Sequence, residues 1–112
     1  LIHGDGLQSR DFTYIDNVVA GNLLAARASK SLKGAVINLA CGDRIDLLRL
    51  VNELNRILGT DIAPEHGPER AGDVKHSQAG VEKARELLGF APVVDFSEGL
   101  RRTAEYYRDC AK

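Results

Sequence analysis

The stretch "GDGLQSRDFTYIDNVVAG", residues 4–21, contains a turn signal followed by a helix signal. Gly4-Asp5-Gly6 predicts a tight turn, because glycine adopts positive φ without strain, with short extended segments on either side. The apolar residues that follow recur at helical spacing, so we expect a helix from about Asp16 to about Ala28, with Asp16 as its N-cap. The stretch therefore predicts extended segments, a turn and a helix in close succession.

The segment "GAVINLAC", residues 34–41, is apolar and rich in β-branched side chains. It lacks strict alternation, which is typical of a strand covered on both faces, as in a parallel sheet. One strand forms no sheet by itself, so we expect its partner strands to lie outside this sequence.

Helix signals recur along the rest of the chain. Residues 46–59, "DLLRLVNELNRILG", show helical apolar spacing, with an aspartate N-cap at the start and a glycine stop at the end. Another helix is expected to end at Gly89, and the last one to follow a capping box of Asp95 and Glu98.

The composition is that of one small globular domain, with 112 residues, 44% of them hydrophobic and 28% charged. The net charge of -1 argues against nucleic-acid and anionic-membrane partners, which select for a basic excess. No apolar run reaches the length of a membrane span, and no signal-peptide pattern opens the sequence. Cys41 and Cys110 are too few and too far apart for a disulfide framework or a metal site, so we expect reduced thiols in a cytoplasmic protein.

The sequence opens on "LIHGDG" and contains no methionine. A natural start carries methionine, so we interpret the chain as the carboxyl-terminal part of a longer protein. A whole small protein that has been trimmed is the alternative.

No self-contained active site is evident in the sequence. There is no Gly-x-Gly-x-x-Gly turn for a dinucleotide, no P-loop and no Gly-x-Ser-x-Gly elbow. His3, His66 and His76 lack the spacing of metal ligands, and we expect such loop histidines to be solvated.

Arg10 in "QSRDF" and Arg70 in "PERAGDVKHS" are the candidate binding residues. A guanidinium is a planar donor fork that matches phosphate oxygens, and two of them can hold a pyrophosphate from different sides. Beside Arg70, Gly72 allows close backbone approach and Asp73 is an acceptor for sugar hydroxyls.

The alternative is that both arginines form ordinary surface ion pairs. Arg10 would then pair with Asp11 or Asp16, and Arg70 with Glu69. Spacing alone favours these pairs, because the Arg-x-Gly-Asp pattern is short and weak without context.

Four blocks, read in order, supply that context. The sequence resembles the carboxyl-terminal region of the extended short-chain dehydrogenase/reductase family, especially the NAD-dependent sugar-nucleotide epimerases and dehydratases that include UDP-glucose and UDP-N-acetylglucosamine 4-epimerases. The resemblance implies an α/β fold over residues 1–112, mostly helical with a few short strands, forming a substrate-binding lobe without the amino-terminal NAD-binding Rossmann domain. The blocks are "GDGLQSRDFTYIDNVV", "AVINLACGDRIDLLRLVNEL", "ERAGDVKHSQAGVEKARELLGF" and "FSEGLRRTAEYYR".

The resemblance also implies the site residues. Arg10 and Arg70 are expected to contact the nucleotide diphosphate, Asp73 the diphosphate and nucleoside region, and Phe12 to line the same pocket without the phenol that family members with tyrosine have. It implies no catalytic, cofactor-binding or metal-binding residue here. NAD would serve the intact parent enzyme, and this chain alone is expected to bind none.

The leading hypothesis is thus the nucleotide-sugar-binding portion of a UDP-sugar 4-epimerase, inactive alone. Alternatives are a fragment of a UDP-glucuronate decarboxylase or dTDP-glucose 4,6-dehydratase, or a non-catalytic truncated module. Expected partners are a UDP-sugar, the Rossmann domain and further copies of the chain. We expect the isolated chain to be oligomeric or marginally stable, because its apolar helix faces and the 35–40 segment lose their covering.

Overall fold

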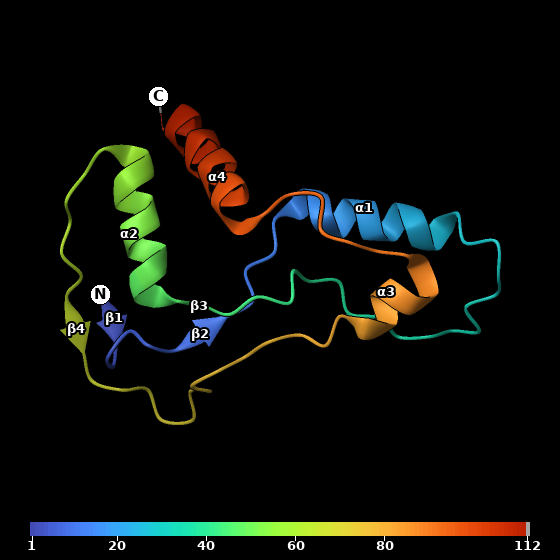
Figure 1. Cartoon of the computed structure of the whole chain (residues 1–112). Helices are drawn as coiled ribbons and strands as arrows, with labels where there is room; N and C mark the ends of the chain where they lie inside the picture. The colour runs from blue at the N-terminus through green and yellow to red at the C-terminus, as the bar shows by residue number, and fades with distance from the viewer. Residues whose placement is uncertain (112) are drawn as a thin grey trace.

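The computed structural model describes residues 1–111, which form helices and very short strands (Figure 1). This confirms the expected α/β class with mostly helical content. No helix within residues 1–111 is long and apolar enough to cross a membrane. The elements in chain order are β1 (Ile2–His3), β2 (Ser9–Arg10), α1 (Ile15–Ala26), β3 (Ile45–Asp46), α2 (Leu47–Leu58), β4 (His66–Gly67), α3 (Glu82–Leu88) and α4 (Phe96–Cys110).

Helix α2 begins and ends where its sequence predicts. The Asp46 carboxylate accepts a hydrogen bond from the Arg49 backbone N–H at 2.7 Å. At the other end Gly59 adopts the left-handed conformation, with φ of 65°, and closes the helix. Local capping chemistry therefore determines both ends of α2.

Helix α4 keeps half of its predicted capping box. Asp95 is the N-cap and accepts from the Glu98 backbone N–H at 2.9 Å. The Glu98 side chain is instead held by arginines of the next turn, Arg101 at 2.8 Å and Arg102 at 2.6 Å. Charge-assisted bonds to guanidinium groups replace the weaker bond back to the cap residue.

Helix α1 departs from the prediction at its start. Its N-cap is Tyr14, which makes no side-chain capping bond, so the prediction that Asp16 caps the helix is wrong. Asp16 lies in the first turn and pairs with Arg102 of α4, with 3.1 Å between Nη1 and Oδ2. A long-range ion pair thus takes the carboxylate that the local pattern assigned to a cap.

The buried face of α1 is also not its most apolar one. Asn17 and Gly21 are buried, whereas Ile15, Val19 and Leu23 remain 60%, 49% and 48% exposed. Gly21 lies against Leu39, and the space there leaves no room for a Cβ atom. The apolar stripe of α1 faces solvent in this chain.

The predicted strand at residues 34–41 does not form. These residues belong to no strand, and Val36 is 81% exposed. The ladders within residues 1–111 are two short pairs, β1 parallel to β4 and β2 antiparallel to β3. A strand needs a neighbour's backbone groups for its hydrogen bonds, and these four strands pair with one another instead of with the segment.

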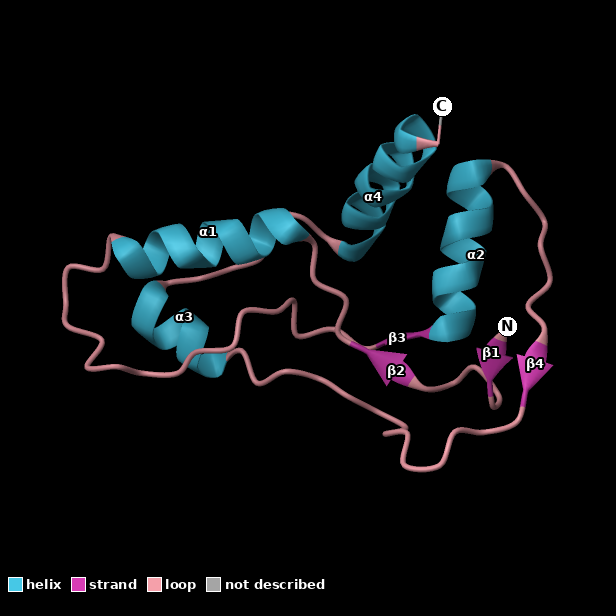
Figure 2. Ribbon diagram, turned by 180° about the vertical axis from the view of Figure 1, so that it is seen from behind, coloured by secondary structure: helices cyan, strands magenta, loops and turns pink. Residues whose placement is uncertain are grey.

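The molecule is flat and open, with principal extents of 50 × 37 × 18 Å. Its radius of gyration is 16.7 Å, against about 13 Å for a compact domain of roughly this size. Figure 2 shows α2 beside α4 at one end and α1 beside α3 at the other. The few buried apolar side chains are spread between these groups: Ile2, Ala40, Ile45, Ala84, Phe90, Val94 and Phe96.

A fully buried asparagine joins the two ends of the molecule. The Asn17 amide donates to the Val94 carbonyl at 2.7 Å and accepts from the Val93 and Val94 N–H groups at 2.8 and 2.9 Å. It thereby ties α1 to the segment between α3 and α4. Because few apolar side chains are buried, this polar contact is a larger part of what holds α1 against the segment between α3 and α4.

Candidate functional site

The two segments that carry the candidate arginines lie side by side, joined first by backbone hydrogen bonds. Strands β1 and β4 pair in parallel, with Ile2 opposite His66 (Figure 1). The Ile2 N–H donates to Glu65 O at 2.7 Å, and the Gly4 N–H donates to Gly67 O at 3.0 Å. We call this junction of residues 2–10 with residues 65–77 the seam.

The seam continues past β1 through both backbone and side chains. Ser9 N–H donates to Lys75 O at 2.9 Å, and Ser77 N–H donates to Ser9 O at 3.0 Å. The Lys75 ammonium contacts the Asp5 carboxylate at 2.6 Å, and this hydrogen bond lowers the pKa of Asp5. The tight turn at residues 4–6 is thus both formed and held against the loop.

All three histidines of the chain lie on the seam, which the sequence did not indicate. The Nδ1 atom of His3 is 3.1 Å from Pro68 O, and that of His66 is 2.7 Å from Gly4 O. His76 Nδ1 is 2.9 Å from Ser9 Oγ. His66 and His76 are exposed, as expected of solvated loop histidines, and His3 is half-buried. Each ring also bridges the two segments, a contact that the spacing of the histidines in the sequence did not indicate.

Arg10 lies at the end of the seam and is held from two sides. Its Nη2 atom donates to Asp73 Oδ1 at 2.6 Å, and its Nη1 atom donates to Ser9 O at 2.8 Å. The side chains of Arg10 and Asp73 remain 31% and 35% exposed, so both are reachable from solvent.

The alternative partners proposed for Arg10 are engaged elsewhere. Both oxygens of Asp11 accept backbone N–H groups, from Cys41 at 3.2 Å and Gly42 at 2.9 Å. Asp16 pairs with Arg102. The local ion pairs of Arg10 that spacing favoured are therefore wrong, since neither carboxylate is turned toward it.

Arg70 and Asp73 line one face of a shallow cavity of about 200 Å³. Within residues 1–111 the Arg70 side chain forms no ion pair, so the predicted pairing with Glu69 is absent from the described chain. The cavity is smaller than the roughly 300–1,000 Å³ of complete small-molecule sites. Its lining residues are His3, Gly4, Asp5, Gln8, Glu69, Arg70, Asp73 and Lys75, of which Arg70 and Asp73 were the sequence candidates for binding.

The predicted site residues do not all share this cavity. Arg10 faces a neighbouring hollow of about 390 Å³ that also contains Asn38 and Ser77. Phe12 lies apart, with its ring centroid 5.8 Å from that of Phe96 on α4. Asp73 therefore contacts Arg10 directly and shares a cavity with Arg70, whereas Arg10 and Arg70 line different hollows and Phe12 lies in a separate aromatic contact.

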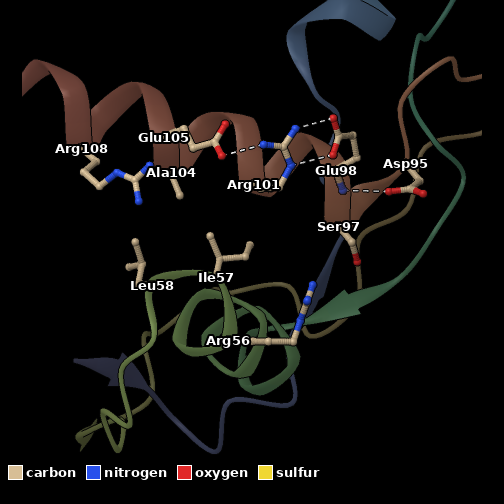
Figure 3. Close-up of a pocket in the computed structure, with 10 residues that line it drawn as sticks. All are labelled: Arg56, Ile57, Leu58, Asp95, Ser97, Glu98, Arg101, Ala104, Glu105 and Arg108. Atoms are coloured by element: carbon tan, nitrogen blue, oxygen red, sulfur yellow. Dashed lines mark hydrogen bonds and ion pairs between the residues drawn. The ribbon is translucent and has the colours of Figure 1, made fainter.

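A further cavity of about 480 Å³ separates α2 from α4 (Figure 3). Its charges are already matched: Arg101 donates to Glu98 at 2.8 Å and to Glu105 at 2.6 Å. These arginine contacts lower the pKa of Glu98 to about 2. The Arg101 guanidinium is thus already engaged by two carboxylates of its own helix.

The described residues hold no cluster of potential metal ligands, and the thiol of Cys41 is not activated. Partial burial and the nearby Asp11 carboxylate raise the pKa of the Cys41 thiol. Asn17 donates to its Sγ at 3.5 Å. Cys41 is thus a half-buried packing residue of the 40–42 loop.

No family model matches the chain, but individual relatives do. It is 35% identical over 109 residues to a UDP-glucuronate 4-epimerase of Thermodesulfobacterium geofontis, covering 96% of this chain and 33% of the relative. It is 32% identical over 108 residues to a UDP-glucose 4-epimerase of Mycolicibacterium smegmatis, covering 96% of this chain and 34% of the relative.

Solved structures give the same picture. The UDP-glucose 4-epimerase of Thermotoga maritima with UDP-glucose superposes with a TM-score of 0.88 and 38% identity, over 99% of this chain and 36% of that one. The UDP-glucuronic acid 4-epimerase of Bacillus cereus with UDP-glucuronic acid and NAD gives 0.90 and 33%, over 97% and 35%. The chain thus spans about one third of the length of the proteins it matches.

Proposed function

We propose that this chain is the part of a UDP-sugar 4-epimerase that holds the nucleotide diphosphate of a UDP-sugar. Its homologues and structural neighbours are UDP-sugar 4-epimerases of the NAD-dependent short-chain dehydrogenase/reductase family. The observation that carries the proposal is that Asp73 contacts Arg10 and lines one cavity with Arg70. These residues come from two segments that are distant in sequence and are joined by backbone hydrogen bonds at residues 2, 4 and 9.

The chemistry of this cluster suits a diphosphate and an adjoining sugar. Arg10 contacts Asp73 and Arg70 lines a cavity with it, and guanidinium forks bind phosphate oxygens through paired, charge-assisted hydrogen bonds. Lys75 lines the same cavity, where its ammonium is paired with Asp5. Asp73 offers carboxylate oxygens as acceptors for ribose hydroxyls.

Holding the nucleotide leaves the reacting sugar free to turn. Binding energy from the remote, non-reacting nucleotide positions the reacting end without gripping it. NAD, when bound to the parent enzyme, would accept a hydride from the sugar and return it to the opposite face. The residues of this chain would do none of that chemistry; they would bind and orient the nucleotide.

We assign no NAD contact to this chain. A dinucleotide site needs a glycine-rich turn between a strand and a helix, and the sequence contains no Gly-x-Gly-x-x-Gly. We place that turn on a Rossmann domain outside this sequence. The unpaired 34–41 segment and the exposed stripe of Ile15, Val19 and Leu23 are the surfaces that such a domain would cover.

The epimerase assignment is preferred to the sister activities. Relatives at 35% and 32% identity are 4-epimerases, whereas the match to a UDP-N-acetyl-alpha-D-glucosaminuronate decarboxylase of Bacillus cytotoxicus is 24% identical. The nucleotide contacts proposed here serve either reaction, since the reacting sugar lies beyond them.

Calorimetric titration of UDP, UDP-glucose and NAD into the chain tests the proposal. We expect heat of binding with UDP and UDP-glucose and none with NAD. If neither UDP nor UDP-glucose gives a heat of binding, the result would indicate a non-catalytic or inert module. Binding of NAD would show that the division into nucleotide-sugar and dinucleotide parts is wrong.

A further inference from the structure

We propose that the Arg10–Asp73 ion pair is an internal latch on the nucleotide site: Asp73 occupies Arg10 until a diphosphate displaces it, and the released carboxylate then binds a hydroxyl of the same ligand. This inference rests on the proposed function and concerns the order of events at that site. It couples recognition of the diphosphate to recognition of the sugar beside it.

The geometry shows that the internal carboxylate stands where an anion would bind. Asp73 Oδ1 is 2.6 Å from Arg10 Nη2, a charge-assisted contact of the kind that phosphate oxygens make. The other terminal nitrogen of Arg10 is already engaged by Ser9 O at 2.8 Å. A phosphate oxygen that approaches Arg10 at Nη2 therefore competes with Asp73 for that nitrogen.

Arg70 provides the first contact for an incoming anion, because its side chain has no ion-pair partner within residues 1–111 and lines the same cavity as Asp73. The two residues also belong to one turn, in which the Asp73 N–H donates to Arg70 O at 3.2 Å. Gly72 holds this turn at φ of 80°, with open space where a Cβ would stand. A ligand on Arg70 is thus brought directly to the carboxylate that it must displace.

The latch is weak enough to open. Both side chains are about one third exposed, and an ion pair at such a site shifts an equilibrium by about fivefold at most. A diphosphate carries more charge than one carboxylate, so it outcompetes Asp73 for the guanidinium. A ligand with a diphosphate but no sugar hydroxyls must also displace Asp73, but it then makes no hydrogen bond to the released carboxylate.

Inorganic pyrophosphate is the probe that isolates the latch, because it has no sugar. We would titrate pyrophosphate and UDP into the wild-type chain and into the single variants Asp73→Asn, Glu69→Gln and Arg10→Ala. Two double variants combine Arg10→Ala with Asp73→Asn or with Glu69→Gln. Glu69→Gln is the matched control, since Glu69 lines the same cavity and its removal changes the charge equally without touching Arg10. Far-UV circular dichroism of each variant confirms an unchanged helix content.

We expect Asp73→Asn to tighten pyrophosphate binding by about threefold to fivefold more than Glu69→Gln does, and to weaken UDP binding relative to pyrophosphate. In the Arg10→Ala background this excess disappears. Equal gains from Asp73→Asn and Glu69→Gln, or an excess that survives without Arg10, would overturn the latch and leave the proposed function standing. Failure of every variant to bind both ligands would instead refute the proposed function.

Discussion

Asp73 Oδ1 lies 2.6 Å from Arg10 Nη2, although the two residues are 63 positions apart in the sequence. The contact closes a seam that begins with β1 against β4 and continues through the Asp5–Lys75 pair. Two short segments with unremarkable local patterns are thereby made into one charged surface. The expectations below follow from this contact and from the open, thinly packed fold around it.

Replacing Arg10 with alanine should weaken UDP binding by about tenfold or more, because hydrogen bonds to charged groups contribute about 1.5–3 kcal/mol. Calorimetric titration measures the loss. Arg27→Ala is the control: Arg27 is exposed at the carboxyl end of α1, away from the seam, and its removal should leave the UDP affinity unchanged. Equal losses in the two variants would show only a general effect of net charge.

Breaking the Asp5–Lys75 pair should loosen the seam without removing a proposed ligand contact. In Asp5→Asn an uncharged amide replaces the carboxylate that Lys75 contacts at 2.6 Å, so the amides of Ser9 and Ser77, which donate across the seam, should exchange hydrogen faster. Hydrogen exchange resolved by mass spectrometry measures this. Unchanged protection there, with Glu53→Gln on α2 as the reference, would show that the backbone bonds alone hold the seam.

Asn17→Ala should lower the free energy of unfolding by about 2–4 kcal/mol, because it leaves the buried N–H of Val94 and the partly buried N–H of Val93 without an acceptor. Thermal or urea unfolding followed by circular dichroism measures the change. Asn22→Ala on the same helix is the matched control, since Asn22 is exposed and bonds only to Val18 O at 2.8 Å. A comparable loss from Asn22→Ala would mean that helix propensity, not the buried contact, explains the effect.

Acid should destabilise α4 through Glu98. Its pKa is lowered from 4.5 to about 2 by Arg101 and Arg102, so the folded state favours the ionised carboxylate. The resulting stabilisation is present above pH 4.5 and is lost as the pH falls toward about 2. Melting temperatures between pH 6 and pH 2 should fall less steeply in Glu98→Gln than in the wild type, and parallel curves would contradict this.

The isolated chain should self-associate through the exposed stripe of α1. Ile15, Val19 and Leu23 are 60%, 49% and 48% exposed, and apolar area of this kind drives association. Light scattering coupled to size exclusion should show oligomers that Val19→Ser with Leu23→Ser shifts toward monomer. Ile62→Ser, which removes an equally exposed apolar side chain from a loop, should not; a cooperatively melting wild-type monomer would refute the expectation.

Local signals explain which features the sequence revealed. The ends of α2 follow from Asp46 and Gly59, residues whose capping interactions span a single helical turn. The turn at residues 4–6 likewise requires only glycine at positive φ. The start of α1 was mistaken because Asp16, a good capping residue by type, is drawn to Arg102 on another helix.

Long-range pairing explains what the sequence concealed. The apolar 34–41 segment has the composition of a buried strand, yet it stays irregular because a strand is completed only by its neighbours. The burial of Asn17 in place of the apolar stripe depends on the backbone of residues 93–94 arriving beside α1. The resemblance to sugar-nucleotide epimerases singled out Arg10, Arg70 and Asp73, but no spacing indicated that Arg10 and Asp73 pair directly.

The sequence by itself determined where the helices α2 and α4 begin, where the chain turns, and which side chains have the chemistry to bind a phosphate. These properties reside in single residues or in contacts within about one helical turn. Only the tertiary structure decided that Arg10 meets Asp73, that the histidines bridge the seam, and that Phe12 packs on Phe96. Such contacts depend on which distant segments pack together, and that choice is made by the packing and hydrogen bonding of the whole chain.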